Sequence, residues 1–383
     1  MDVSLPGRSA TAARAGERSV LRHVDVTLLA VVLALVGFGL LMVYSATNRT
    51  LAEFGDDPAL FLKRQGAFAA VGVAAMVVVA ALDYRFVRLY AGVLYAVTVL
   101  LLVLVQTPLG TTSRGAQRWF QVGGLQLSPS LFTRLTLAAA LAAYLAQLKG
   151  EMRLRHVLAA TGLAVVPMFL VFIQPDIGTS IILAAILVAL LVAAGARAKH
   201  LVVLALAAAL AIFGAFQLGM VKEYQVQRLV SFLDPSADPL RAGYNKQQAE
   251  IAVGAGGVFG RGYLRGTQTT LDFVPEHHTD FIFTVVGEEL GFVGSMALLA
   301  LFGVLLWRAF RIALLARDPF GTYLAVGVAA MIAIQVFINV GMTIGIMPIT
   351  GIPLPFISYG GSALVADFMG IGLLLNVHLR RFA

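Results

Sequence analysis

Ionisable residues gather at the end of the longest polar connector, in the stretch Pro275-Glu-His-His-Thr-Asp280. Asp280 directly precedes an apolar run that contains a second acid, Glu288. Carboxylates in such runs are costly in lipid and usually face a protein interior or a water-filled cavity. The spacing predicts that both lie on a similar face of one helix, about 12 Å apart. The alternative is that Asp280 only caps the helix N-terminus, where a carboxylate is favoured.

Further charged residues occur at or near apolar runs. Arg118 and Trp119 form a cation beside an aromatic ring, and the Arg fork suits bidentate binding of phosphate. The competing interpretation is a residue pair of the interfacial aromatic belt. Arg134 opens one apolar run and Asp367 lies inside another, which indicates a shared polar cavity. Asp176, in Gln174-Pro-Asp176, is typical of a tight turn that caps the next helix.

The segment 351–362, Gly-Ile-Pro-Leu-Pro-Phe-Ile-Ser-Tyr-Gly-Gly-Ser, combines two prolines with paired glycines directly before an apolar run. Irregular backbone of this kind is tolerated at membrane depth only where protein or a cavity covers it. We therefore expect a re-entrant segment, in which Ser358 and Tyr359 are the polar side chains.

Composition places these residues in a membrane protein. Hydrophobic residues make up 59% of the 383 residues and charged residues only 13%, and the mean hydropathy is +0.88. A soluble domain needs far more polar surface. The net charge of +8 is spread over short connectors, which argues against nucleic-acid binding. The absence of cysteine excludes disulfides and thiolate chemistry, and the six histidines show no metal-ligand spacing.

The predicted fold is an all-α polytopic membrane protein with about ten transmembrane helices. The ten apolar stretches are 24–46, 66–82, 87–106, 131–147, 157–173, 180–196, 200–220, 281–307, 321–346 and 362–378. A long connector, 221–280, separates the seventh from the eighth, and its apolar residues favour interfacial helices. We predict a basic, disordered tail at 1–22 and a single membrane domain at 23–383 that includes this connector.

The distribution of basic residues predicts the orientation. If the N-terminus is cytoplasmic, sixteen Lys and Arg residues fall in inner segments and five in short outer loops. The positive-inside rule therefore places both termini in the cytoplasm and the connector 221–280 outside.

Several motifs resemble the SEDS family (shape, elongation, division and sporulation), and within it the RodA branch more than the FtsW branch. They occur in family order from about Val24 to the end of the chain. The matching blocks are Gly115-Ala-Gln-Arg-Trp119, Gln174-Pro-Asp-Ile-Gly-Thr-Ser180, Phe232-Leu-Asp-Pro235, Gly266-Thr-Gln268, Pro275-Glu-His-His-Thr-Asp-Phe-Ile-Phe283, Glu288-Glu-Leu-Gly291, Met347-Pro-Ile-Thr-Gly-Ile-Pro-Leu-Pro-Phe356 and Ser358-Tyr-Gly-Gly361.

The resemblance implies a peptidoglycan glycosyltransferase in the bacterial cytoplasmic membrane that polymerises lipid II at the outer face during cell elongation. It implies a class B penicillin-binding protein as partner, contact with membrane lipid and the elongation machinery, and no organic cofactor. Asp280 matches the family's essential acid. Substrate-binding roles are expected for Arg118, Trp119, Arg134, Glu276, His278, Glu288, Ser358 and Tyr359.

Chemistry independently requires such an acid. A sugar hydroxyl that attacks an anomeric carbon needs a general base, for which a carboxylate is suited. The pyrophosphate leaving group needs cations, which Arg118, Arg134 or a divalent metal such as Mg²⁺ or Mn²⁺ could supply.

One departure from the family pattern leaves alternatives open. The family has Pro-Ser-Glu, two further residues and Lys, whereas this chain has Leu131 and Arg134 in place of the acid and the Lys. Asp367 is a candidate for the missing acid. A lipid II flippase and a non-catalytic scaffold for the transpeptidase remain competing functions, although hydropathy shows no clear inverted repeat.

Overall fold

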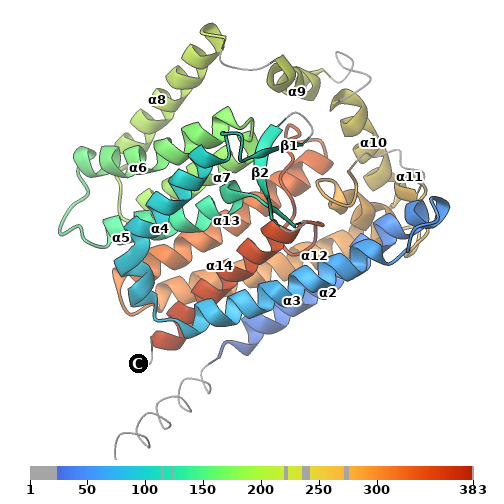
Figure 1. Cartoon of the computed structure of the whole chain (residues 1–383), viewed down its shortest axis with the longest axis horizontal. Helices are drawn as coiled ribbons and strands as arrows, with labels where there is room; N and C mark the ends of the chain where they lie inside the picture. Colours follow the sequence, from blue (N-terminus) through green and yellow to red (C-terminus); the bar gives the residue numbers. More distant parts are fainter. Residues whose placement is uncertain are drawn as a thin grey trace, which may run out of the picture.

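Ten apolar helices make up most of the computed structural model, which describes residues 24–113, 116–122, 125–219, 223–234, 242–270 and 276–381. Eight are long and apolar enough to cross a membrane, and two, α5 and α7, are shorter. These ten correspond to the ten predicted stretches, so the predicted fold class is confirmed (Figure 1). They are α2 (Val26–Glu53), α3 (Leu60–Ala81), α4 (Tyr84–Leu104), α5 (Pro129–Leu145), α6 (Leu154–Ile173), α7 (Ile177–Ala193), α8 (Ala198–Gln217), α12 (Ile282–Leu314), α13 (Pro319–Thr343) and α14 (Gly361–Arg380).

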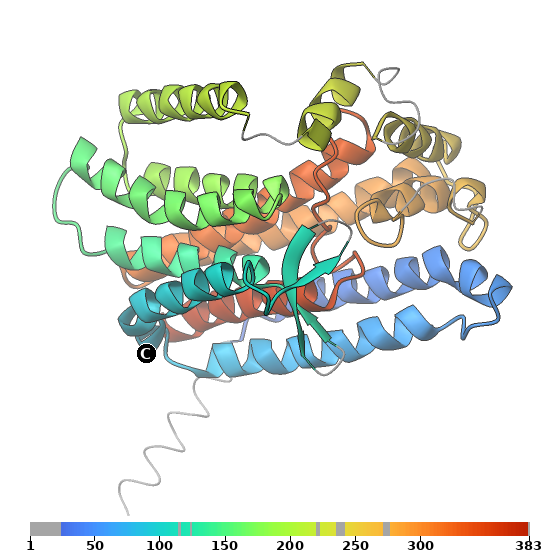
Figure 2. The same cartoon turned by 45° about the horizontal axis from the view of Figure 1, so that its top comes forward.

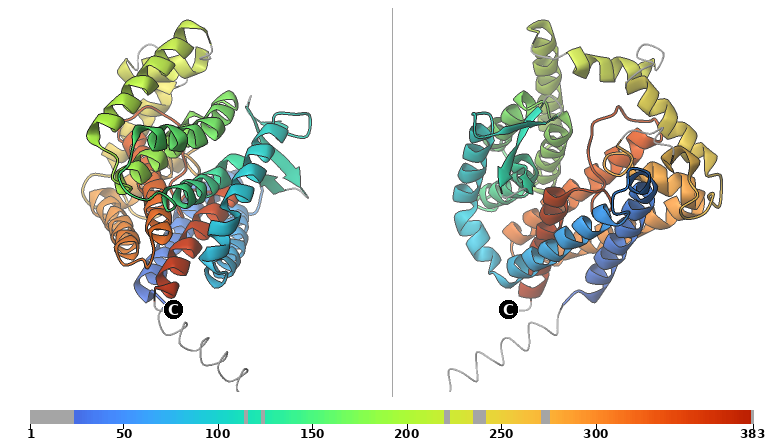
Figure 3. Two further views of the ribbon diagram at one scale, coloured as in Figure 1. Left: turned by 90° about the vertical axis from the view of Figure 1, so that its left-hand side faces the viewer. Right: turned by 45° about the vertical axis from the view of Figure 1, so that its right-hand side comes forward.

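The core of the bundle surrounds α13 and α14, whose most apolar windows are 67% and 78% buried. Helix α14 lies along α3, and α13 contacts α5, α7 and α12. Helix α8 is the opposite case, since only 6% of its window is buried. It stands apart from the other helices in Figures 1 and 3. The predicted tail, residues 1–22, lies outside the described residues.

The long connector contains short helices, as its apolar residues predicted. They are α9 (Glu223–Leu233), α10 (Ala242–Ala255) and α11 (Thr267–Thr270). Helix α10 packs on α12 and α13, at the opposite end of the molecule from the C-terminus (Figure 1).

The structure adds a small antiparallel sheet that the sequence did not indicate. Strands β1 (Thr111–Ser113), β2 (Ala116–Val122) and β3 (Leu125–Leu127) follow one another in the order β1-β2-β3 (Figure 2). Thr111 pairs with Trp119, and Phe120 pairs with Leu127. The sheet was not predicted, because strands this short lack a readable alternation of apolar and polar residues.

Ion pairs join the helix ends on one side of the bundle. Asp25, before α2, pairs with Arg308 near the end of α12, and Asp83, between α3 and α4, pairs with Arg380 at the end of α14. The start of α2 therefore lies beside the end of α12, and the end of α3 lies beside the end of α14.

Helix α12 is broken at Gly291, where φ is 66° and ψ is −161°. A break leaves backbone groups without helical partners, which is costly at membrane depth. The glycine-rich segment 256–262 satisfies them. Backbone N–H groups of Arg261 and Gly262 donate to the carbonyls of Glu288 and Glu289, at 3.0 and 2.9 Å. In return, the amides of residues 292 and 293 donate to the carbonyls of 257 and 258.

This backbone pairing requires a very close approach, which explains a glycine at 256. A Cβ atom on Gly256 would lie 1.9 Å from the carbonyl oxygen of Gly287. Only two residues away, a Cβ atom on Gly254 would meet nothing within 4 Å.

We predict that Gly256→Ala destabilises the protein by about 1–3 kcal/mol, the usual cost of overpacking. Gly254→Ala should be neutral or slightly stabilising, because Ala favours the helix that Gly254 occupies. Thermal unfolding of both variants in detergent micelles tests this. Equal midpoints for the two variants would contradict the close packing of 256–262 on α12.

Candidate active site

Asp280 lies in a turn formed by residues 276–281, immediately before α12. The helix begins at Ile282, and its N-cap residue is Phe281. Asp280 therefore does not occupy the cap position, and the capping interpretation is wrong. It is also not on the same helix as Glu288, so the predicted common helical face is wrong for the same reason.

The backbone of Asp280 is fixed by a buried amide on α13. The Nδ2 atom of Asn339 donates to the carbonyl of Asp280 at 2.8 Å and to that of Ile352 at 2.7 Å. Its side chain is fully buried, and its Oδ1 atom has no hydrogen-bond partner. Asn339 thus joins the turn before α12 to the segment before α14.

The Asp280 carboxylate faces the backbone of Gly351. A Cβ atom on Gly351 would lie 3.2 Å from Oδ2 of Asp280, and Gly351 has a φ of 75°. Glycine at 351 therefore allows both the left-handed backbone and the close approach of the acid. The Asp280 side chain is half-buried, at the end of the bundle remote from the Asp25–Arg308 pair.

Residues 352–358 are largely covered by protein, as expected for irregular backbone at membrane depth. The side chain of Gln65 on α3 donates to the carbonyl of Ser358 at 3.0 Å and accepts from the amide of Gly360 at 3.3 Å. Gly39 on α2 packs so closely that a Cβ atom there would lie 2.4 Å from the carbonyl oxygen of Phe356.

The structure gives Ser358 a structural contact. Its side chain is buried, and its Oγ atom accepts a hydrogen bond from the amide of Leu354 at 2.8 Å. The neighbouring residue Tyr359 is half-buried and donates its backbone N–H to the carbonyl of His278 at 2.9 Å. His278 and Tyr359, two predicted binding residues, are thereby brought together beside the turn that carries Asp280.

The two predicted glutamates occupy different environments. Glu276 is half-buried and accepts a hydrogen bond from the Thr279 hydroxyl at 3.1 Å. Glu288 is fully buried and accepts from the amide of Gln268 at 2.8 Å. Glu288 therefore anchors the Gly266-Thr-Gln268 motif to α12, whereas Glu276 stabilises the turn before that helix.

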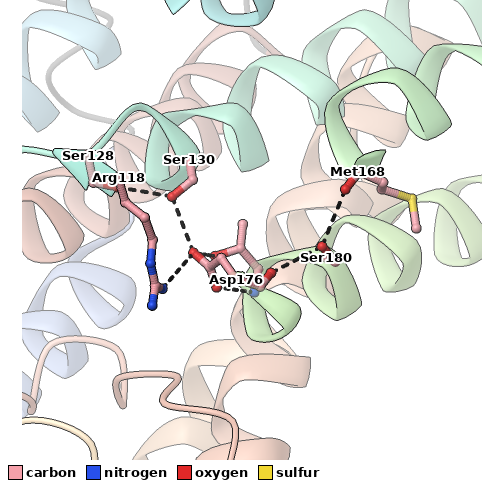
Figure 4. A network of polar contacts seen from close by, with 7 residues as sticks. Arg118, Ser128, Ser130, Met168, Asp176 and Ser180 are labelled. Carbon is pink, nitrogen blue, oxygen red and sulfur yellow. Dashed lines mark hydrogen bonds and ion pairs between the residues drawn. The ribbon is translucent and has the colours of Figure 1, made fainter. Parts of the chain in front are cut away.

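A second polar group of the site is the ion pair between Arg118 and Asp176 (Figure 4). The Nη1 atom of Arg118 lies 3.4 Å from Oδ2 of Asp176, and the Arg118 side chain is 28% exposed. Its Nε atom has no hydrogen-bond partner. The guanidinium also lies 5.4 Å from the centroid of the Trp119 ring. Strand β2 holds both residues.

Asp176 caps α7, as its motif predicted. Its Oδ1 atom accepts from the amide of Thr179 at 3.0 Å, and its Oδ2 atom accepts from the Thr179 hydroxyl at 2.9 Å. The Ser130 hydroxyl on α5 also donates to Asp176, at 3.4 Å (Figure 4). This carboxylate therefore connects β2, α5 and the N-terminus of α7.

Close packing at the start of α7 connects the Arg118 region with the Asp280 region. A Cβ atom on Gly178 would lie 2.6 Å from the Ile352 side chain and 3.3 Å from the carbonyl of Thr350. Gly351, which lies between Thr350 and Ile352, faces Asp280. Arg118, the N-terminus of α7 and Asp280 therefore lie around one segment, 350–352. A helix N-terminus and an Arg both favour an anion.

Arg134 lies elsewhere, inside the helix bundle. Its side chain has no exposed surface. Its Nη1 atom donates to the side chain of Gln335 on α13, and its Nη2 atom lies 3.7 Å from Oδ1 of Asp367 on α14. This conformation offers no surface of Arg134 to a phosphate, in contrast to half-buried Arg118.

Four contact residues were missed in the sequence: Gln65, Gln335, Asn339 and Phe61, whose ring centroid lies 5.2 Å from that of His278. Three are amides inside or beside apolar helices, where an uncompensated polar group is costly. A Gln or Asn inside an apolar run therefore indicates a buried polar contact, just as a charged residue does. Phe61 carried no such signal, because aromatic residues are common in apolar helices.

The described residues do not present a preformed metal site. None of their His, Asp and Glu side chains form a group of three or more that could hold a metal ion. Among the predicted residues, Asp280 and Glu276 are the acids that are half-buried and near the site.

Comparison with known proteins agrees with this fold. A family model described as a cell cycle protein, covering FtsW, RodA and SpoVE, matches residues 26–382. Stage V sporulation protein E of Bacillus subtilis is 40% identical over 92% of this chain and 96% of its own length. Peptidoglycan glycosyltransferase MrdB of Escherichia coli is 38% identical over 94% of each chain.

Solved structures give the same result. A chain from a study of the structural coordination of polymerization and crosslinking by a peptidoglycan synthase complex matches with a TM-score of 0.79 and 32% identity, over 94% of this chain and 98% of its own. The crystal structure of RodA from Thermus thermophilus matches with a TM-score of 0.69 and 30% identity, over 94% and 98%. The expected glycosyltransferase class agrees with these relatives, and the chain belongs to the SEDS family of FtsW, RodA and SpoVE.

Proposed function

We propose that this protein polymerises lipid II into glycan strands and that Asp280 is its general base. The observation that carries the proposal is the position of the Asp280 carboxylate. It is half-buried, faces Gly351, and belongs to a turn that Asn339 fixes through its backbone. A carboxylate placed in this way is available for proton transfer.

The proposed step is a displacement at the anomeric carbon of one lipid-linked sugar. The hydroxyl oxygen of a second sugar forms the new glycosidic bond, while the bond to the undecaprenyl pyrophosphate breaks and its electron pair leaves with the pyrophosphate. The hydroxyl proton passes to Asp280. Arg118 stabilises the leaving anion. Substrate binding then competes with Asp176 for the Arg118 guanidinium.

Lipid II places this reaction at the outer face of the cytoplasmic membrane, with both termini in the cytoplasm. The basic residues support this orientation, because they concentrate on the side of the Asp25–Arg308 and Asp83–Arg380 pairs. We further propose a role in cell elongation with a class B penicillin-binding protein as partner. The related peptidoglycan synthase complex, whose study joins polymerization and crosslinking, supports a crosslinking partner.

Mg²⁺ usually keeps several waters and is bound by one or two carboxylates together with substrate phosphates. A Mg²⁺ or Mn²⁺ ion that takes part would therefore arrive on the pyrophosphate, with Asp280 and Glu276 as the nearby acids.

We predict that Asp280→Asn lowers the rate of lipid II polymerisation by about 10²-fold or more, as expected for loss of a general base. The substitution keeps the size of the side chain and removes its basicity. The assay uses the purified protein together with its transpeptidase partner. Asp56→Asn, which alters an exposed acid between α2 and α3, is the matched control and should polymerise at the wild-type rate.

The same preparation separates the competing functions. Unchanged glycan synthesis by Asp280→Asn would rule out the proposed base. Scrambling of lipid II across liposomes that continues when polymerisation is blocked would favour a flippase. Stimulation of the transpeptidase by a protein that makes no glycan would favour a scaffold.

The buried pair of Arg134 and Asp367 explains how the chain tolerates Leu131. A buried Arg without a counter-charge is strongly destabilising, and the usual cost of removing one partner of a buried pair is about 3–5 kcal/mol. Here the counter-charge comes from α14. We propose that Asp367 replaces the acid that the family pattern has at position 131, one helical turn before Arg134.

We predict that Asp367→Asn lowers the thermal midpoint and the yield of folded protein. Combining it with Leu131→Glu should recover both, because residues three apart on a helix are neighbours. Glycan synthesis should follow stability in both variants. If the double variant is no more stable than Asp367→Asn alone, the two acids are not equivalent and the proposal fails.

A further inference from the structure

Three aromatic side chains from distant parts of the chain meet beside Asp280. They are Phe61 in the first turn of α3, His278 in the turn before α12, and Tyr359 before α14. The ring centroids of Phe61 and Tyr359 are 4.8 Å apart at an interplanar angle of 88°. His278 lies 5.2 Å from Phe61 and 6.0 Å from Tyr359. We call these three residues the aromatic cluster.

Hydrogen bonds fix the cluster relative to the acid. The backbone amide of Tyr359 donates to the carbonyl of His278 at 2.9 Å. Gln65, one turn after Phe61 on α3, holds the residues on both sides of Tyr359 through their backbone groups. His278 precedes Asp280 by two residues in the same turn. The rings of His278 and Tyr359 are therefore fixed in the turn that carries Asp280 and in the segment that packs against it.

The degree of burial distinguishes the cluster from core packing. Phe356 and Phe368, the ring pair of the core below, are 2% and 0% exposed. All three rings of the aromatic cluster are only half-buried, and they lie at the end of the bundle that carries Asp280. Part of their apolar surface therefore remains open to a ligand at the site.

A pyranose ring fits such a surface. Its axial C–H groups form an apolar face that packs against aromatic rings, while its hydroxyl groups remain directed to polar partners. Aromatic side chains also lose little conformational entropy on binding, because they have few rotatable bonds. A lipid tail, in contrast, would gain nothing from the histidine or from a tyrosine hydroxyl.

We propose that the aromatic cluster binds a sugar ring of the substrate and orients it toward Asp280, with Phe61 as a specificity-determining residue. This inference rests on the proposed function, since it assigns a sugar subsite to the same reaction. It adds Phe61 to the site.

The experiment compares the affinity of two ligands for the purified protein in detergent micelles. One is lipid II, and the other is undecaprenyl pyrophosphate, which has the same lipid and pyrophosphate but no sugar. Phe61→Leu removes the ring and keeps an apolar side chain, whereas Phe61→Tyr keeps the ring. Phe54→Leu is the control, because Phe54 lies at the end of α2, is 80% exposed and is not part of the aromatic cluster.

We expect Phe61→Leu to weaken lipid II binding by about tenfold, which is the upper range for one aromatic contact. Binding of undecaprenyl pyrophosphate should stay within twofold of wild type, and Phe61→Tyr and Phe54→Leu should bind both ligands normally. Lipid II affinity that is unchanged in Phe61→Leu, or an equal loss for both ligands, would overturn the proposal.

Failure of the proposed function gives a different result. Wild-type protein that makes no glycan contradicts the polymerase, whatever the affinities. The difference between the two ligands, measured without turnover, still reports on the aromatic cluster.

Discussion

The cost of an unpaired backbone group at membrane depth governs this structure. Regular helices satisfy their own amides and carbonyls, so each irregular segment must obtain partners from other parts of the chain. Two segments do so here. The break at Gly291 is paired with residues 256–262, and the segment 351–360 is held by Gln65 and Asn339. The candidate active site lies beside the second of these irregular segments, where the Asp280 carboxylate faces Gly351.

Asn339 supplies a partner to irregular backbone and also fixes the position of the acid. One Nδ2 group donates to carbonyls from two different segments, 280 and 352, which no sequence pattern places together. A donor that serves two carbonyls holds them at a fixed separation. Apolar packing is less strict, because only a carbonyl that loses its donor pays the cost of an unpaired buried group. The position of Asp280 is therefore set from the helix behind it.

The membrane spans could be predicted from the sequence because each is a long continuous run of apolar residues. All ten spans were predicted, and Asp176 was correctly interpreted as a helix cap. Prediction from the sequence was less successful where contacts join distant segments. Asp280 and Glu288 were predicted on one helix, but the start of α12 at Ile282 depends on the tertiary contacts of the preceding turn. The partner of Arg134 came from α14, 233 residues later, and spacing along one helix could not show that.

If Asp280 accepts a proton during glycan synthesis, a small added carboxylate should partly replace its side chain. The rate of lipid II polymerisation by Asp280→Ala would be measured with and without added formate, a small carboxylate that can enter the space left by the side chain. We expect a rate reduced by about 10²-fold or more that formate partly restores in a saturable manner. A wild-type rate in the absence of formate would contradict this role of Asp280.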